Sequence, residues 1–222
     1  MSTRVSYLKF RQSIITFSPF LVIGIGQLSI RLLAPIFGVW SWAPFWLVYI
    51  STLGCFIALD SGQNQAMKWL EPPQGSWGWG ILAIVIPVAM TLPIFIPNWR
   101  LLLASEVWLS TLFFIAINPV VEEFYWRGVV LDSTTGWPRW LSVAYAVTGF
   151  ALHHLWLGVL TVAGRHPSAL IGPVVMGLIW AVSYLKTRSL RWSIAGHFLV
   201  NVFSLSVPVF LNLYTPPSFP GS

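Results

Sequence analysis

Long apolar runs separated by short polar connections make up almost the whole chain. An apolar run of about 20 residues can cross the hydrocarbon core of a membrane as a helix, because a helix rises about 1.5 Å per residue. The pattern therefore predicts an all-α, polytopic transmembrane helical bundle of about seven spans, within a range of six to eight. The predicted spans are 13–38, 42–59, 79–96, a fourth from about 100 past 122, then 140–156, 168–185 and 193–213.

The connections carry the residue types that end helices. Residues 60–78 form the longest polar gap and contain Gly, Gln, Asn and the pair Pro72-Pro73, so we predict a loop there. Residues 157–167 contain glycine and are predicted to be partly helical. Pro119 falls inside the fourth span, where a proline removes one backbone hydrogen bond, and it predicts a kink just before Glu122.

Composition supports a membrane protein and leaves no stretch for a separate soluble domain. The 222 residues are 56% hydrophobic and only 8% charged, whereas soluble domains are about 25% charged. We therefore predict a single integral membrane domain, residues 1–222. Because Cys55 is the only cysteine, the chain has no internal disulfide bond.

The positive charges are scattered singly between the spans, so the net charge of +6 does not predict nucleic-acid binding. Their distribution fits the positive-inside rule when the N-terminus is cytoplasmic and the C-terminus lies on the opposite side. The outer side then holds only Arg100 and Arg165. The cytoplasmic side holds Arg4, Lys9, Arg11, Lys68, Arg127, Arg139, Lys186, Arg188 and Arg191.

Two adjacent carboxylates and an arginine follow a long apolar run in the fourth span. A charge at the centre of a bilayer costs about 2.5 to 3.5 kcal/mol on insertion scales, so such groups indicate function. Glu123 and Arg127 are four residues apart with the acid first, the better orientation for an ion pair on a helix. Glu122 is rotated by about 100° from Glu123, so we expect the two acids to have different roles.

Imidazole and amide side chains occur in two later spans. His197 and Asn201 share one helix face, as do Phe150 and His154, because each pair is four residues apart. His153, the neighbour of His154, is a second candidate in that span, but it lacks a phenylalanine four residues before it.

These residue types are compatible with two forms of hydrolysis. Glu122, His154 and His197 are ligand types for zinc, but no His-Glu-x-x-His pair is present to hold a metal on one helix. Without a metal, a carboxylate and an imidazole can activate a water molecule, while a second imidazole and an amide donate to the oxyanion. Both alternatives predict hydrolysis of a peptide or acyl group, and the metal-free form is favoured.

The ordered set Glu122-Glu123-x-x-x-Arg127, Phe150-x-x-x-His154 and His197-x-x-x-Asn201 on apolar helices resembles the signature of the CPBP family of intramembrane proteases. This family includes the CAAX prenyl endopeptidases and bacterial Abi-like homologues associated with bacteriocin processing and immunity. The resemblance covers about residues 101–213. It divides the chain into N-terminal spans without a motif, 1–98, and a protease-like core, 99–213, built from the last four spans.

The resemblance implies a role for each matched position. Glu122 would act as general base on a water shared with His154, and His197 with Asn201 would stabilise the oxyanion. Glu123, Arg127 and Phe150 would support the site structurally. The implied mechanism is of the glutamate type, with no cofactor.

We therefore expect an intramembrane endopeptidase that acts on a peptide or a membrane-anchored protein near the surface of a lipid bilayer. A prenylated CAAX substrate is one of several alternatives, and the sequence predicts no oligomeric state. A non-catalytic immunity or assembly factor of the same family and a small proton-coupled transporter are the alternative functions.

Overall fold

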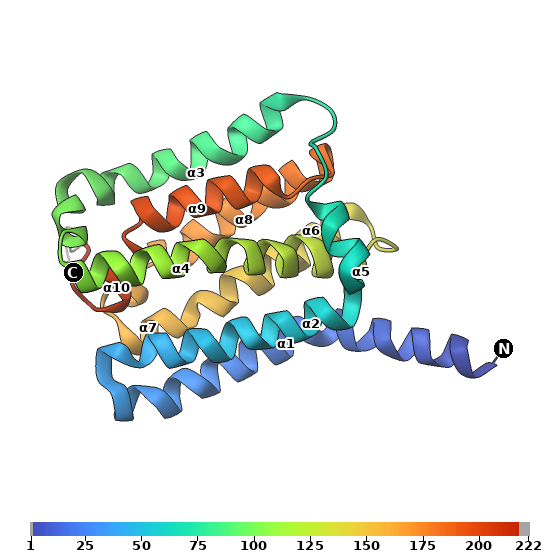
Figure 1. Ribbon diagram of the computed structural model, residues 1–222, viewed down its shortest axis with the longest axis horizontal. Coiled ribbons are helices and arrows are strands. Elements are labelled where there is room, and N and C mark those ends of the chain that lie inside the picture. Colours follow the sequence, from blue (N-terminus) through green and yellow to red (C-terminus); the bar gives the residue numbers. More distant parts are fainter. Residues whose placement is uncertain (1, 218–222) are drawn as a thin grey trace.

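Long helices run back and forth along one axis and pack side by side into a bundle (Figure 1). The computed structural model describes residues 2–217, with side chains described for residues 11–60 and 66–217. About 85% of the chain is helical, and the described residues contain no strand. The elements are α1 (Ser2–Phe37), η1 (Gly38–Ser41), α2 (Trp42–Trp69), α3 (Trp77–Asn98), η2 (Trp99–Leu102), α4 (Ser105–Glu123), η3 (Phe124–Val129), α5 (Val130–Ser133), α6 (Arg139–His153), η4 (His154–Trp156), α7 (Leu157–Leu160), η5 (Ala163–Arg165), α8 (Ser168–Thr187), α9 (Arg191–Phe203) and α10 (Ser206–Phe210).

Five helical stretches are long and apolar enough to cross a membrane, which confirms the all-α polytopic class. They are Arg11–Asp60, Trp77–Leu102, Ser105–Ser133, Arg139–Leu160 and Ser168–Thr187. The first stretch, of 50 residues, contains both α1 and α2, which fold back on each other through η1 (Figure 1). The count of about seven spans stays a prediction.

The last predicted span, 193–213, is wrong as one continuous helix. Helix α9 has 13 residues and ends at Phe203, and Leu205 then takes a left-handed conformation with φ 54° before α10 begins. Pro208 explains the break, since a proline cannot donate to the carbonyl four residues earlier and is tolerated in the first turn of a new helix. At about 1.5 Å per residue, α9 is only about 20 Å long, short of the roughly 30 Å hydrocarbon core.

The predicted loop 60–78 is mostly helical, which corrects that prediction. Helix α2 continues to Trp69, and only the segment 70–76, with Pro72 and Pro73, is irregular. Asp132 of α5 connects the end of α2 to α8. Its Oδ2 accepts a hydrogen bond from Trp69 Nε1 at 2.9 Å, and its Oδ1 accepts one from the Tyr184 hydroxyl at 2.9 Å. Glutamine, alanine, methionine and lysine are good helix formers, so a polar composition does not by itself end a helix.

Close packing of α3, α8 and α9 places the middle of α9 inside the bundle. A Cβ atom at position 196 would lie 2.3 Å from the Ala83 carbonyl oxygen, so only glycine allows α9 to approach α3 this closely. The same carbonyl accepts a hydrogen bond from Trp180 Nε1 on α8 at 2.9 Å. His197, the next residue after Gly196, is therefore carried into the interior.

Basic residues gather at the end of the bundle where α1 begins. Lys68, Arg139, Lys186, Arg188 and Arg191 lie at or next to the termini of α2, α6, α8 and α9 at this end, whereas Arg100 and Arg165 lie at the other (Figure 1). Arg127 was predicted on the cytoplasmic side, but it is buried inside the bundle and 1% exposed. The direction in which the bundle sits in the membrane stays a prediction.

Candidate active site

Glu122 and Glu123 lie at the C-terminal end of α4, where the helix changes type. Helix α4 continues through Pro119 to Glu123, and the departure from α-helical geometry comes afterwards, in the π-helix η3. Single π turns inside helices occur frequently at functional sites. Glu122 is 4% exposed and Glu123 is fully buried, so each carboxylate needs a partner.

Arg127 pairs with Glu123 across one turn, as the four-residue spacing predicts. Its Nη1 lies 3.0 Å from Glu123 Oε1. The guanidinium carbon also lies 4.2 Å from the ring centre of Phe150 and 5.3 Å from that of Trp180. These contacts connect α4 and η3 to α6 and α8, which is consistent with the supporting role expected for Glu123, Arg127 and Phe150.

His197 lies between the two carboxylates. Its Nε2 is 3.3 Å from Glu122 Oε2, its Nδ1 is 3.0 Å from Glu123 Oε1, and its ring stacks on Trp180 with centroids 4.5 Å apart. The Nδ1 contact with Glu123 is a hydrogen bond, whereas the Nε2 contact with Glu122 is an ion-pair contact, which requires a proton on both ring nitrogens. With both nitrogens protonated, the imidazolium and Arg127 balance both carboxylates, and the buried cluster is neutral.

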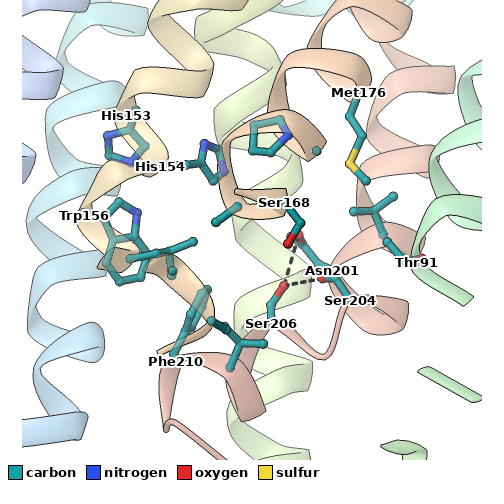
Figure 2. Close-up of a pocket in the computed structure, with 18 of the residues that line it drawn as sticks. Thr91, His153, His154, Trp156, Ser168, Met176, Asn201, Ser204, Ser206 and Phe210 are labelled. Carbon is teal, nitrogen blue, oxygen red and sulfur yellow. Dashed lines mark hydrogen bonds between the residues drawn. The ribbon is translucent and has the colours of Figure 1, made fainter. Parts of the chain in front are cut away.

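Asn201 lies one turn after His197 and has an unused donor. Its Oδ1 accepts a hydrogen bond from the Ser206 hydroxyl at 3.5 Å, and Ser206 also contacts Ser204 at 3.0 Å (Figure 2). The Nδ2 group is buried and has no acceptor among the residues whose side chains the structure describes. A buried amide without a partner is costly, so this group is suited to donate to a bound molecule.

His154 marks the end of α6, where the chain enters the 3-10 turn η4. Its Nδ1 lies 2.8 Å from the Phe150 carbonyl oxygen. Because a carbonyl only accepts, Nδ1 carries the proton, and Nε2 is left as an acceptor. The Phe150 ring packs edge-on to the imidazole with centroids 4.7 Å apart, as the shared helix face predicts.

His153 points to a different part of the bundle (Figure 2). It is 2% exposed, and its ring stacks on Tyr49 of α2 with centroids 3.9 Å apart and an interplanar angle of 10°. On its other side, a Cβ atom at position 26 of α1 would lie 3.3 Å from the imidazole Cε1. His153 therefore helps to pack α6 against α1 and α2, whereas His154 projects toward the polar residues.

One cavity of about 400 Å³ brings the predicted catalytic side chains together. It is bordered by Glu122, His154, His197 and Asn201, which come from α4, η4 and α9. Part of its lining comes from residues 163–164, 166–169 and the segment with Tyr214 and Pro216, and none of its lining residues belongs to the connections at the basic end. The cavity therefore extends toward the end of the bundle opposite the start of α1, where α7 and α10 lie (Figure 1).

Metal-ligand types do not converge in the described part of the chain. No group of three or more His, Cys, Asp and Glu side chains among those residues has an arrangement that could hold a metal ion. Both His197 nitrogens face carboxylates at hydrogen-bonding or ion-pair distances. The metal-free form stays a prediction, and the mechanism proposed below is written with protein side chains alone.

Several cavity residues escaped the sequence analysis. Asn118 had a usable signal, because it lies four residues before Glu122 and so shares its helix face. Trp46, Tyr49 and Trp180 also border the cavity, but apolar and aromatic residues are so frequent in this chain that nothing local distinguished them from lipid-facing ones.

Residues 104–203 match the family model described as type II CAAX prenyl endopeptidase, Rce1-like. The match runs from the start of α4 to the end of α9 and includes every predicted site residue. No curated protein and no solved structure shows significant similarity to the chain. Through residues 104–203, less than half of the chain, the protein therefore resembles the Rce1-like type II CAAX prenyl endopeptidase family.

Proposed function

We propose that the protein is an intramembrane endopeptidase in which Glu122 and His154 activate a water molecule. The observation that carries this proposal is the single cavity bordered by Glu122, His154, His197 and Asn201 within apolar helices. A cavity with a few convergent polar groups and predominantly apolar walls is the usual form of a binding site. The family match supports a CAAX-type protease.

In the proposed mechanism, water lies between the Glu122 carboxylate and the free Nε2 of His154. Glu122 takes a proton as the water oxygen attacks the peptide carbonyl carbon, and the negative charge moves to the carbonyl oxygen. Asn201 Nδ2 and His197 donate hydrogen bonds to this oxyanion. Protonated Glu122 then returns its proton to the leaving amine as the C–N bond breaks.

The contact between His197 and Glu122 couples these steps. His197 Nε2 lies 3.3 Å from Glu122 Oε2. When Glu122 accepts the proton, its carboxylate loses the negative charge that attracts the imidazole. The oxyanion forms nearby in the same step. The His197 N–H can then turn from the carboxylate toward the oxyanion and donate a hydrogen bond to it.

His154 and His153 can be distinguished by substitution. We expect His154→Ala to lower kcat for cleavage by at least about 100-fold, because it removes the second group that orients the water. His153→Phe should retain nearly the wild-type rate, since a phenyl ring preserves the stack on Tyr49. An internally quenched peptide with a farnesylated cysteine followed by three residues provides the assay for the reconstituted protein. The reverse ranking of the two variants would contradict the assignment.

The charge distribution leads us to propose a cytoplasmic N-terminus and a cavity that opens to the other side of the membrane. Ser168 lies at the cavity mouth and Thr135 at the basic end, and both are exposed. In a Cys55→Ser background, we expect a membrane-impermeant maleimide to label Ser168→Cys in right-side-out vesicles and Thr135→Cys only after permeabilisation. The opposite labelling pattern would reverse the proposed orientation.

A further inference from the structure

The carboxamide of Asn118 borders the cavity one helical turn before Glu122. Both residues lie on α4 and are buried, with Asn118 4% exposed. Side chains four residues apart project from the same face of a helix. Any molecule that reaches Glu122 through the cavity therefore passes close to Asn118.

Trp46 of α2 fixes the orientation of this carboxamide. Its Nε1 lies 3.0 Å from Asn118 Oδ1, and the contact is buried. An indole N–H can only donate, so it selects the oxygen of the amide and excludes the nitrogen. The indole is itself held by edge-on packing with Phe113, with ring centres 5.4 Å apart, and by a tilted contact with Phe114.

The amide nitrogen of Asn118 is left for a bound molecule. Among the residues whose side chains the structure describes, none accepts a hydrogen bond from Nδ2. The Nδ2 atom also does not belong to the fully buried polar atoms that lack a hydrogen-bond partner. Since Asn118 borders the cavity, its NH₂ group is accessible from the cavity while its oxygen is occupied. The result is a fixed, neutral donor beside the proposed general base.

We propose that Asn118 is a positioning residue for the peptide substrate and that its Nδ2 donates a hydrogen bond to a main-chain carbonyl next to the scissile bond. This inference rests on the proposed protease function. A neutral amide donor matches a carbonyl oxygen, which an extended peptide presents at every residue. Trp46 lies outside residues 104–203, so the N-terminal helices contribute to the site by orienting a residue of the matched segment.

A contact made in both the bound substrate and the transition state changes KM more than kcat. We therefore expect Asn118→Leu, which keeps the size of the side chain and removes the donor, to raise KM for the farnesylated quenched peptide by about 3- to 10-fold, the range for one neutral hydrogen bond. The value of kcat should change by less than about twofold. Because KM does not depend on the fraction of folded enzyme, a partly unfolded preparation does not imitate this result.

Trp46→Phe tests the orientation separately. It removes the indole donor and keeps an aromatic ring, so we expect a smaller rise in KM. In the double variant Trp46→Phe/Asn118→Leu, KM should equal that of Asn118→Leu alone, because Trp46 acts through Asn118. An additive effect of Trp46→Phe, or an unchanged KM in Asn118→Leu, would overturn the inference.

The inference and the proposed function fail in distinguishable ways. If Glu122→Gln cleaves the peptide as well as the wild type, the protease proposal is wrong and the role of Asn118 falls with it. If cleavage depends on Glu122 and Asn118→Leu leaves KM unchanged, only the role of Asn118 is wrong. If Asn118→Leu lowers kcat alone, Asn118 does not hold the substrate in the ground state, and the proposal is again overturned.

Discussion

Glu122→Gln is expected to lower kcat for peptide cleavage by about 10²- to 10⁴-fold, the usual contribution of a general base. The substitution keeps the size of the side chain and leaves an oxygen that can accept from His197 Nε2, which lies 3.3 Å from the carboxylate in the native protein. It removes the negative charge and, with it, the ability to take a proton from water. The bundle should therefore remain folded while hydrolysis stops, and the assay is cleavage of the farnesylated quenched peptide by reconstituted protein.

Glu106→Gln is the matched control on the same helix. Glu106 lies in the first turn of α4, is exposed, accepts a hydrogen bond from the Ser105 hydroxyl and does not line the cavity. Its replacement should leave cleavage unchanged.

If Glu122→Gln retains the wild-type rate at equal protein levels, the alternative of a non-catalytic immunity or assembly factor replaces the protease. A proton-coupled transporter would instead show flux that depends on a pH gradient.

Arg127→Met is expected to destabilise the protein by about 3 to 5 kcal/mol, because removing one partner of a buried ion pair leaves an uncompensated charge. Arg127 is the only cation in contact with Glu123 among the described residues apart from a protonated His197. Methionine keeps much of the apolar contact with Phe150 and Trp180. The free energy of unfolding in detergent is the quantity to measure.

The double variant Glu123→Gln/Arg127→Met should recover most of the lost stability, since it removes both charges and leaves a neutral side chain that can still bond His197. Arg139→Met serves as the control, because Arg139 is exposed at the start of α6 and its loss should change stability by less than about 0.5 kcal/mol. Equal destabilisation by the two single arginine variants would show that the buried pair is not a structural support.

Local spacing accounts for the parts of the site that were predicted from the sequence. The contact of Glu123 with Arg127 and that of Phe150 with His154 each join residues four apart, and helical geometry alone places such pairs on one face. The all-helical membrane class follows from apolar runs long enough to span a bilayer. The roles of these residues were suggested by the family resemblance and not by spacing.

Helix ends were harder to predict. The break of the last span at Leu205 follows from Pro208, whereas the continuation of α2 to Trp69 and the packing of the chain after α10 involve contacts made elsewhere. Trp69 is held by Asp132, more than sixty residues away, and Val162 N–H donates to Asn212 just beyond α10. A local pattern of apolar and polar residues does not contain these partners, so it misplaces the ends.

By itself, the sequence determined the all-helical class, which helix faces carry polar groups and which charges form local pairs, because each of these depends on residues close together in the chain. Only the tertiary structure decided that His197 lies between Glu122 and Glu123. It also decided that His154, and not His153, projects toward these two acids. The orientation of Asn118 by Trp46 was likewise visible only in the tertiary structure. These contacts join residues on different helices. They depend on the distances between helices, which are set by packing in three dimensions. For example, Gly196 allows α9 to approach α3 closely.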